Sequence, residues 1–306
     1  MSTPAVEPSG ILLINKHAGA TSHDIVYKVR RALHTKRVGH TGTLDPMATG
    51  VLVVLVGRAA KACEYVSHDR KVYRATLRLG LTTDTEDVTG TVLTTCDTLP
   101  SPDRVAEACS RFTGKIQQIP PMYSALKVDG QKLCDLARKG IEVERAAREV
   151  EIYSLSCEPT DSERDYILTV DCSGGTYIRT LCADIGAALG CGGVMTTLER
   201  VQTGTFPLDQ CITTAELEAM DDAQRIARLL TVEVLFSDLP RVCLSDFYKR
   251  LCRNGCEIYQ NKIHTNFKVG QRVRICDANG HFFALGEVRE YEGGTAIAMI
   301  KLFELE

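Results

Sequence analysis

One loop organises this sequence, and it reads Gly39-His40-Thr41-Gly42-Thr43-Leu44-Asp45-Pro46-Met47-Ala48-Thr49-Gly50. Its three glycines and one proline exclude a helix or a regular strand, because glycine adopts backbone angles closed to other residues and proline lacks an N–H donor. The run that follows, Val51 to Val56, is apolar and rich in β-branched residues, as is typical of a buried strand. We therefore expect the loop to be pinned at the edge of a core.

Asp45 is the only carboxylate in this loop, and a basic segment precedes it. The segment runs from Lys28 to Arg37, and no acidic residue lies between Asp24 and Asp45. A lone carboxylate that follows a basic segment indicates a site where an anionic substrate binds and an acidic group acts on it. An isolated Asp-Pro is most often a turn opener or a helix cap. The functional interpretation therefore depends on the whole string, which is long and specific.

The string resembles the active-site motif of the TruB family of tRNA pseudouridine synthases. In that family the aspartate of Gly-Thr-Leu-Asp-Pro is catalytic, which implies this role for Asp45. Lys71-Val72-Tyr73-Arg74-Ala75 resembles the second family motif, whose tyrosine packs on the target base. The resemblance thus implies that Tyr73 lines the pocket, although a strand tyrosine is ordinarily a core residue.

Two later stretches continue the resemblance in the family's order. Gly175-Thr176-Tyr177-Ile178-Arg179 matches a motif whose arginine pairs with the catalytic aspartate and whose tyrosine contacts the substrate, here Arg179 and Tyr177. Thr196 to Arg200 matches a weaker motif whose leucine, here Leu198, helps to close the pocket. The chain departs from that motif at Glu199, where many members carry a basic or apolar residue.

The implied reaction is isomerisation of uridine 55 in the T loop of tRNA to pseudouridine. A stacked uridine must be flipped out before it can react, and Tyr73 offers an aromatic face to receive it. His40 would hold the RNA or fill the vacated space, and Lys16 would grip phosphate together with the basic segment. Asp45 could attack C1′, attack C6 or remove the C2′ proton, and a neighbouring arginine would favour its ionised form.

Composition is consistent with a cytoplasmic RNA-binding enzyme that needs no cofactor. The chain has 306 residues, a net charge of −3 and 13 cysteines without a Cys-x-x-Cys pair. We expect reduced thiols, because the start of the chain has no apolar signal core. Cys252, Cys256 and His264 match no common zinc spacing, so no metal site is expected. The isomerisation needs neither a redox cofactor nor a group donor, and the chain shows no dinucleotide or P-loop motif.

Periodicity predicts the main elements. We expect strands over 10–15, 51–56, 72–79, 91–95, 149–155 and 166–172, and helices beginning at Thr21 or Ser22, at Ser101–Asp103, near Lys132 and at Arg179. One amphipathic helical region is expected from Ile212 to about Leu235, and strands over 272–275, 282–288 and 297–303. The stretch from Gln118 to Gly130, with two prolines, should be extended.

The resemblance implies an α+β fold with a mixed, mostly antiparallel central sheet and flanking helices. We expect residues 1–237 to form a pseudouridine synthase catalytic domain and residues 238–306 to form a small β-rich, PUA-like RNA-binding domain. The expected partner is the T arm of tRNA, with the protein a monomer that requires no protein partner. The alternatives are a non-catalytic tRNA-binding or tRNA-folding protein and a guide-RNA-dependent pseudouridine synthase. An RNA methyltransferase is more distant, since no methyl-donor motif is visible.

Overall fold

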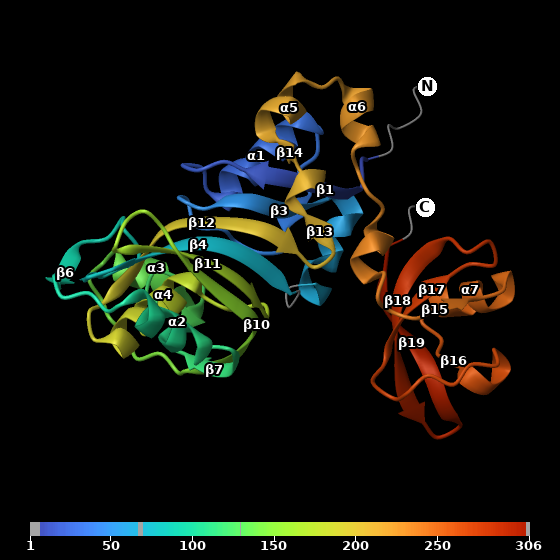
Figure 1. Cartoon of the computed structure of the whole chain (residues 1–306). Helices are drawn as coiled ribbons and strands as arrows, with labels where there is room; N and C mark the ends of the chain where they lie inside the picture. Colours follow the sequence, from blue (N-terminus) through green and yellow to red (C-terminus); the bar gives the residue numbers. More distant parts are fainter. Residues whose placement is uncertain (1–6, 67–69, 129, 304–306) are drawn as a thin grey trace.

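A mixed ten-stranded sheet forms the centre of the molecule in the computed structural model, which describes residues 7–66, 70–128 and 130–303 (Figure 1). Residues 1–6 of the polar start and Asp129 of the predicted extended stretch lie outside the described residues. The strand order is β14 (Ile212–Thr213), β1 (Gly10–Lys16), β3 (Thr49–Val56), β12 (Gly193–Thr203), β4 (Lys71–Leu79), β11 (Asp165–Cys172), β10 (Arg148–Pro159) and β7 (Gly114–Gln118). Two short strands extend it, β2 (Val38–His40) on β3 and β13 (Phe206–Pro207) on β12.

The sheet is antiparallel except at two pairs, which confirms the predicted α+β class. Strand β1 runs parallel to β14, and β12 runs parallel to β3. The second of these contacts pairs Glu199 with Thr49 and Arg200 with Gly50. It therefore brings the weak fourth motif directly beside the end of the organising loop.

Helix α1 (Ser22–Ala32) covers the sheet near β1 and β3, as predicted (Figure 1). Thr21 and Asp24 form a capping box at its start, which satisfies two backbone N–H donors. The predicted apolar face is buried, with Ile25 and Val29 fully inaccessible to solvent. The 3-10 helix η1 (Gly57–Tyr65) follows β3 directly. This packing fixes the position of the loop between α1 and β3.

A second layer lies over the other half of the sheet. Helix α2 (Pro102–Ser110) packs against β10, and α4 (Ile178–Leu189) packs against β12 and β4. Helix α3 (Leu133–Ala137) appears in the same part of Figure 1. The hairpins β5 (Leu81–Thr83) with β6 (Val92–Thr95) and β8 (Lys127–Val128) with β9 (Gln131–Lys132) project beside them. The predicted Ser101, Lys132 and Arg179 helix starts each lie within one or two residues of the observed ones.

The region predicted to be helical, from Ile212 to about Leu235, contains three short helices with breaks that were not predicted. After η2 (Leu208–Gln210) and β14, the chain forms α5 (Thr214–Ala219), α6 (Asp222–Ala227) and the 3-10 helix η3 (Val232–Phe236). Thr213 and Asp221 each begin a new helix with a capping box. Met220 is extended between them. The amphipathic pattern is compatible with one long helix and with several short ones, and the capping boxes select the short helices.

The C-terminal residues form a second sheet of five strands. Its order is β15 (Arg241–Cys243), β17 (Arg272–Cys276), β18 (Phe282–Tyr291), β19 (Gly294–Leu302) and β16 (Ile258–Tyr259), with α7 (Asp246–Arg253) and η4 (Gln260–Lys262) beside it. The three predicted strands in this region are confirmed. Phe236, Phe282 and Phe303 pack together where this sheet meets the larger one, and the rings of Phe282 and Phe303 stack. Within the described ranges, no helix is long and apolar enough to cross a membrane.

Candidate active site

A cavity of about 320 Å³ opens beside the organising loop, within the range of small-molecule pockets. Residues 41–45 form one wall, β4 and β12 form the floor, and residues 123–126 and 175–179 form the opposite wall. Its lining includes five residues singled out by the sequence motifs: Asp45, Tyr73, Tyr177, Arg179 and Leu198. The structure therefore brings together side chains from four separate motifs.

Side chains outside the loop hold the loop that carries Asp45. The buried Ser22 hydroxyl, at the start of α1, accepts from Leu44 N at 2.9 Å and donates to Leu44 O at 3.2 Å. Lys16 Nζ and Gly19 N both donate to Pro46 O, at 3.2 and 2.8 Å. The residues on both sides of Asp45 are thus fixed, as expected for a loop pinned to the core.

Arg200 of β12 also holds the loop, through hydrogen bonds to its backbone carbonyls. Its side chain is 1% exposed, and its guanidinium donates to Val51 O at 2.7 Å, to Gly42 O at 3.1 Å and to Thr43 O at 3.5 Å. Gly50 lies against the Arg200 backbone with φ of +102°, and a Cβ there would come within 2.2 Å of Arg200 O. This glycine is therefore required by the close approach of β3 and β12.

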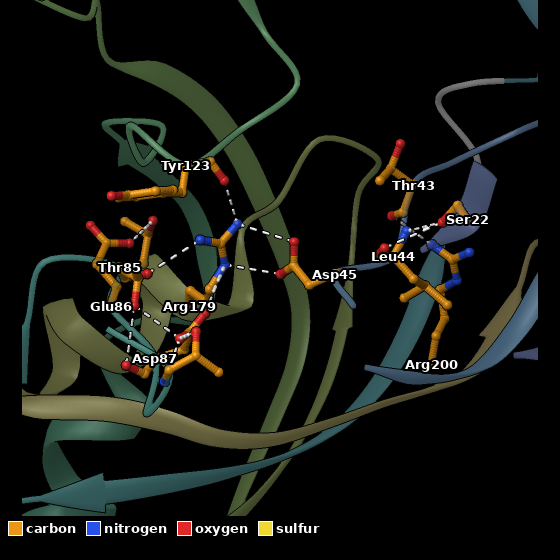
Figure 2. A network of polar contacts seen from close by, with 12 residues as sticks. Ser22, Thr43, Leu44, Asp45, Thr85, Glu86, Asp87, Tyr123, Arg179 and Arg200 are labelled. Carbon is orange, nitrogen blue, oxygen red and sulfur yellow. Dashed lines mark hydrogen bonds and ion pairs between the residues drawn. The ribbon is translucent and has the colours of Figure 1, made fainter. Parts of the chain in front are cut away.

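Arg179 grips Asp45 through two hydrogen-bonding nitrogens (Figure 2). Arg179 Nε lies 2.9 Å from Asp45 Oδ2, and Nη2 donates to Oδ1 at 3.2 Å. Two further N–H groups donate to backbone carbonyls, Tyr123 O at 2.8 Å and Thr85 O at 3.2 Å. A guanidinium bound in this forked way has little freedom to turn. The carboxylate is consequently held in one orientation at the cavity wall.

The acidic turn after β5 contributes a second carboxylate. Asp87 is buried, and its Oδ2 lies 3.9 Å from Arg179 Nε (Figure 2). Val88 N donates to Met195 O and Met195 N donates to Glu86 O, at 3.0 and 3.1 Å. These backbone bonds dock the turn on β12. The buried arginine therefore faces two carboxylates rather than one.

Burial dominates the electrostatics of Asp45. It raises the pKa of this carboxyl, the Arg179 charge opposes the rise, and the Asp87 charge adds to it. The predicted effect of the arginine is thus present, but it does not cancel the cost of removing the carboxylate from water. Asp45 is a stronger base than an ordinary exposed aspartate.

Tyr73, Leu198 and Tyr177 line the cavity from different elements. Tyr73 on β4 lies opposite Arg200 of β12, and burial raises the pKa of its hydroxyl. Tyr177 is the N-cap of α4. The buried Gln118 side chain clamps the Tyr177 main chain, accepting from its N at 3.0 Å and donating to its O at 3.2 Å. The clamp fixes the helix end that carries Arg179.

Two predicted substrate-binding residues, Lys16 and His40, lie outside the group of side chains that the cavity brings together. Lys16 is 0% exposed, and its Nζ donates to His17 O, Ala20 O and Pro46 O. These carbonyls hold the Lys16 ammonium in this structure, and the phosphate contact predicted for it stays a prediction. His40 is not among the described residues that line the cavity. Its ring packs edge-on against His23, and burial lowers its pKa to about 4, so it is neutral at pH 7.

The basic segment before the loop is partly neutralised by acids. Lys28 pairs with Glu218 at 3.2 Å, and Arg37 pairs with Glu7 at 3.4 Å. Arg30 donates to Val38 O at 3.0 Å. The tertiary structure therefore leaves less of this segment's charge for phosphate than the sequence indicates.

Sequence reasoning missed three residues that organise the site. Arg200 lies in the weak fourth motif, Gln118 precedes the two prolines, and Asp87 belongs to the acidic turn at residues 84–87. The position of Arg200 two residues after the motif leucine, Leu198, could have identified it as a candidate. No local pattern distinguishes a buried Gln118 or Asp87 from an exposed one.

The chain matches two consecutive family models. Residues 30–178 match the N-terminal domain of "TruB family pseudouridylate synthase", and residues 179–236 match the "tRNA pseudouridylate synthase B C-terminal domain". Among solved structures, "Crystal Structure of a Cbf5-Nop10-Gar1 Complex" aligns with a TM-score of 0.75 at 23% identity, over 99% of this chain and 91% of that chain. That likeness concerns the fold alone.

Curated relatives extend the match to nearly the full length. "tRNA pseudouridine synthase B" of Alkaliphilus oremlandii is 46% identical over 97% of this chain and 100% of its own. The proteins of the same name from Dechloromonas aromatica and Clostridium kluyveri are 47% and 41% identical, over 91% and 96% of this chain and 91% and 99% of their own. With this identity across almost the whole length and two family models matching in succession, the chain belongs to the TruB family of pseudouridylate synthases.

Proposed function

We propose that this enzyme converts uridine 55 in the T loop of tRNA to pseudouridine, with Asp45 as the catalytic carboxylate. The observation that carries the proposal is the Asp45 carboxylate, gripped by Arg179 and exposed to a cavity lined by Tyr73. Relatives that align over most of the chain are named tRNA pseudouridine synthase B, which supports tRNA as the substrate.

The cavity suits a flipped uridine. Entry of the base costs a few kcal/mol of unstacking, which stacking on the Tyr73 ring would partly offset. Leu198 of β12 and Tyr177, the residue before α4, line the cavity and would enclose the base. The C1′–N1 bond then breaks and a C1′–C5 bond forms, while C5 loses its proton and N1 gains one. No atom of the nucleotide is lost in this exchange, and no electron acceptor is needed.

Asp45 can act as a nucleophile or as a base only when its carboxyl group is ionised. Attack at C1′, attack at C6 and removal of the C2′ proton all require a free carboxylate lone pair. Arg179 favours that form and keeps the oxygens aimed at the cavity. The raised pKa of Asp45 adds basicity, which benefits all three routes.

We further propose that residues 238–306 form an RNA-binding domain that contacts the tRNA outside the T loop. Helix α7 supports this, because its last turn carries Arg250 and Arg253. Phosphate contacts of this kind position an RNA without reading its sequence. We propose a cytoplasmic monomer that works without an obligatory protein partner.

The experiment is turnover on an unmodified elongator-tRNA transcript, with pseudouridine mapped by position. Wild type, Asp45→Asn and the exposed control Asp209→Asn are compared side by side. We expect product at the single T-loop uridine 55 in wild type and in Asp209→Asn, and none in Asp45→Asn despite retained tRNA binding. Product at the wild-type rate in Asp45→Asn would remove Asp45 from the mechanism.

The same experiment separates the alternatives. Binding without product in the wild type would favour a tRNA-binding or tRNA-folding protein. Product that forms only after a guide RNA is added would favour a guide-dependent enzyme.

A further inference from the structure

Glu86 has a backbone conformation that residues with a side chain usually avoid. Its φ is +63°, in the left-handed region where glycine and asparagine are the common residues. The residue belongs to the acidic turn at residues 84–87, which also carries Asp87. A conformation of this kind persists only where the surrounding contacts hold it, and such residues gather at functional sites. The contacts that Glu86 makes therefore call for an explanation.

The residues on both sides of Glu86 face the guanidinium of Arg179 (Figure 2). Thr85 O accepts from Arg179 Nη1 at 3.2 Å, and Asp87 Oδ2 lies 3.9 Å from Arg179 Nε. The Glu86 carbonyl accepts from Met195 N at 3.1 Å, so the main chain of the turn is also bound to β12. The conformation at Glu86 therefore decides whether the groups before and after it both reach the arginine.

The Glu86 side chain joins the turn to α4. Its Oε2 accepts from the Thr180 hydroxyl at 2.6 Å. Thr180 is buried, and it follows Arg179 directly on the helix. A bond of this length between a hydroxyl and a carboxylate is one of the stronger kinds of hydrogen bond. It is therefore suited to offset the strain in the backbone of the turn.

We infer that Glu86 is a positioning residue for the reaction, because its hydrogen bond with Thr180 holds the acidic turn in the conformation that presents Thr85 O and the Asp87 carboxylate to Arg179. This inference rests on the proposed function. Arg179 in turn binds both oxygens of Asp45. Glu86 thus acts on the catalytic carboxylate through the arginine, without touching the substrate.

The contact with Thr180 does not depend on the ionisation of Glu86. Burial raises the pKa of this carboxyl, and the hydrogen bond from Thr180 and the Arg179 charge oppose the rise. In either form the carboxyl keeps an oxygen that accepts a hydrogen bond. The titratable side chains around it are Asp87 on the same turn, Arg145 before β10, and Arg179, Cys182 and Asp184 on α4. Glu86→Gln, which keeps an acceptor and removes the charge, is therefore the conservative substitution.

The test compares variants with the wild type in single-turnover reactions on a T-arm stem-loop RNA between about pH 4 and 8. Glu86→Gly removes the acceptor and also relieves the left-handed backbone, so its folding should not suffer. Thr180→Val removes the donor and keeps the branched shape of the side chain. Glu163→Gly, at an exposed turn residue, is the matched control. RNA dissociation constants and melting temperatures are measured for each protein.

We expect Glu86→Gly and Thr180→Val each to lower the single-turnover rate about tenfold, as for the loss of one hydrogen bond. The double variant should be no slower than either single one, because both substitutions remove the same contact. The acid limb should move to higher pH in Glu86→Gly, since a displaced Arg179 favours the ionised form of Asp45 less. RNA binding should not change, and Glu86→Gln and Glu163→Gly should keep the wild-type rate and acid limb.

Other results overturn the inference. A wild-type rate in Glu86→Gly would show that the side chain is not needed. A lower melting temperature with an unmoved acid limb would make Glu86 a residue of stability alone. Equal losses in Glu86→Gln and Glu86→Gly would assign the effect to the charge and not to the hydrogen bond with Thr180. Failure of the wild type to form pseudouridine would instead overturn the proposed function, so the two failures are distinguishable.

Discussion

Arg179 Nε lies 2.9 Å from Asp45 Oδ2, yet the two side chains differ in exposure, at 5% for the arginine and 30% for the aspartate. The arginine is locked by carbonyls of Thr85 and Tyr123, while the carboxylate reaches the cavity. The Asp45–Arg179 ion pair is thus in place without a substrate, which is the preorganisation expected of a charged group at an active site.

Arg179→Lys should lower the single-turnover rate by about 100-fold, the scale expected for misplacement of a reacting group by about 1 Å. Lysine keeps the charge but cannot bind two carboxylate oxygens and two carbonyls at once. The tRNA dissociation constant should change little. Arg111→Lys, an exposed pair with Glu107, is the matched control. A loss confined to binding would identify Arg179 as a phosphate clamp.

The acid limb of the pH–rate profile should reflect Asp45. Burial raises the pKa of this carboxyl above its usual 3.8. Because only the ionised form reacts, activity should fall as the pH drops through that raised value. Arg179 lowers the pKa, so Arg179→Met should shift the limb to higher pH. Single-turnover rates between about pH 4 and 8 measure this, and a limb displaced to lower pH in the variant would contradict the assignment.

Arg200→Met should reduce both stability and turnover. The substitution leaves the carbonyls of Val51 and Gly42 without their donor, and we expect a loss of about 3 kcal/mol from hydrogen bonds to a charged group. Urea unfolding measures the loss. Arg228→Met, on an exposed helix end, should unfold like the wild type. Unchanged stability and turnover in Arg200→Met would show that the loop holds its shape without this arginine.

Lys16→Met should leave the salt dependence of tRNA binding unchanged. Its Nζ is buried among three carbonyls, and burial lowers its pKa to about 8. A residue that contacts phosphate instead reduces the slope of log K against log salt by about 1. The exposed Lys36→Ala is the comparison, measured across the same salt series. A smaller slope in Lys16→Met would restore the phosphate role for this residue.

The contribution of Lys16 to the stability of the protein should depend on pH. Its pKa is about 8 in the folded protein against 10.5 when exposed. The unfolded chain therefore binds more protons between those values, so the contribution of Lys16 to stability rises from pH 8 to 10.5. The difference in melting temperature between wild type and Lys16→Met should follow this trend, and a difference independent of pH would contradict it.

Local patterns predicted the elements that local rules control. Helix α1 follows from its cap at Thr21 and the apolar spacing of Ile25 and Val29, and β4 follows from strict alternation around Tyr73. The stretch after Ile212 is largely helical as predicted, but its division into short helices that begin at the caps Thr213 and Asp221 was not predicted. Periodicity reports which face is apolar, and it does not report where the backbone is interrupted.

The amino-acid sequence alone determined the family and the identities of Asp45, Tyr73 and Arg179 as candidate site residues, since these rest on contiguous motifs. Only the tertiary structure decided which atoms meet. Asp45 and Arg179 bond across 134 residues, Lys16 is buried rather than exposed, and the buried Gln118 side chain binds the main chain of Tyr177. The physical reason is that hydrogen-bond partners and desolvation depend on neighbours brought together by sheet pairing, whereas motifs and periodicity record only residues adjacent along the chain.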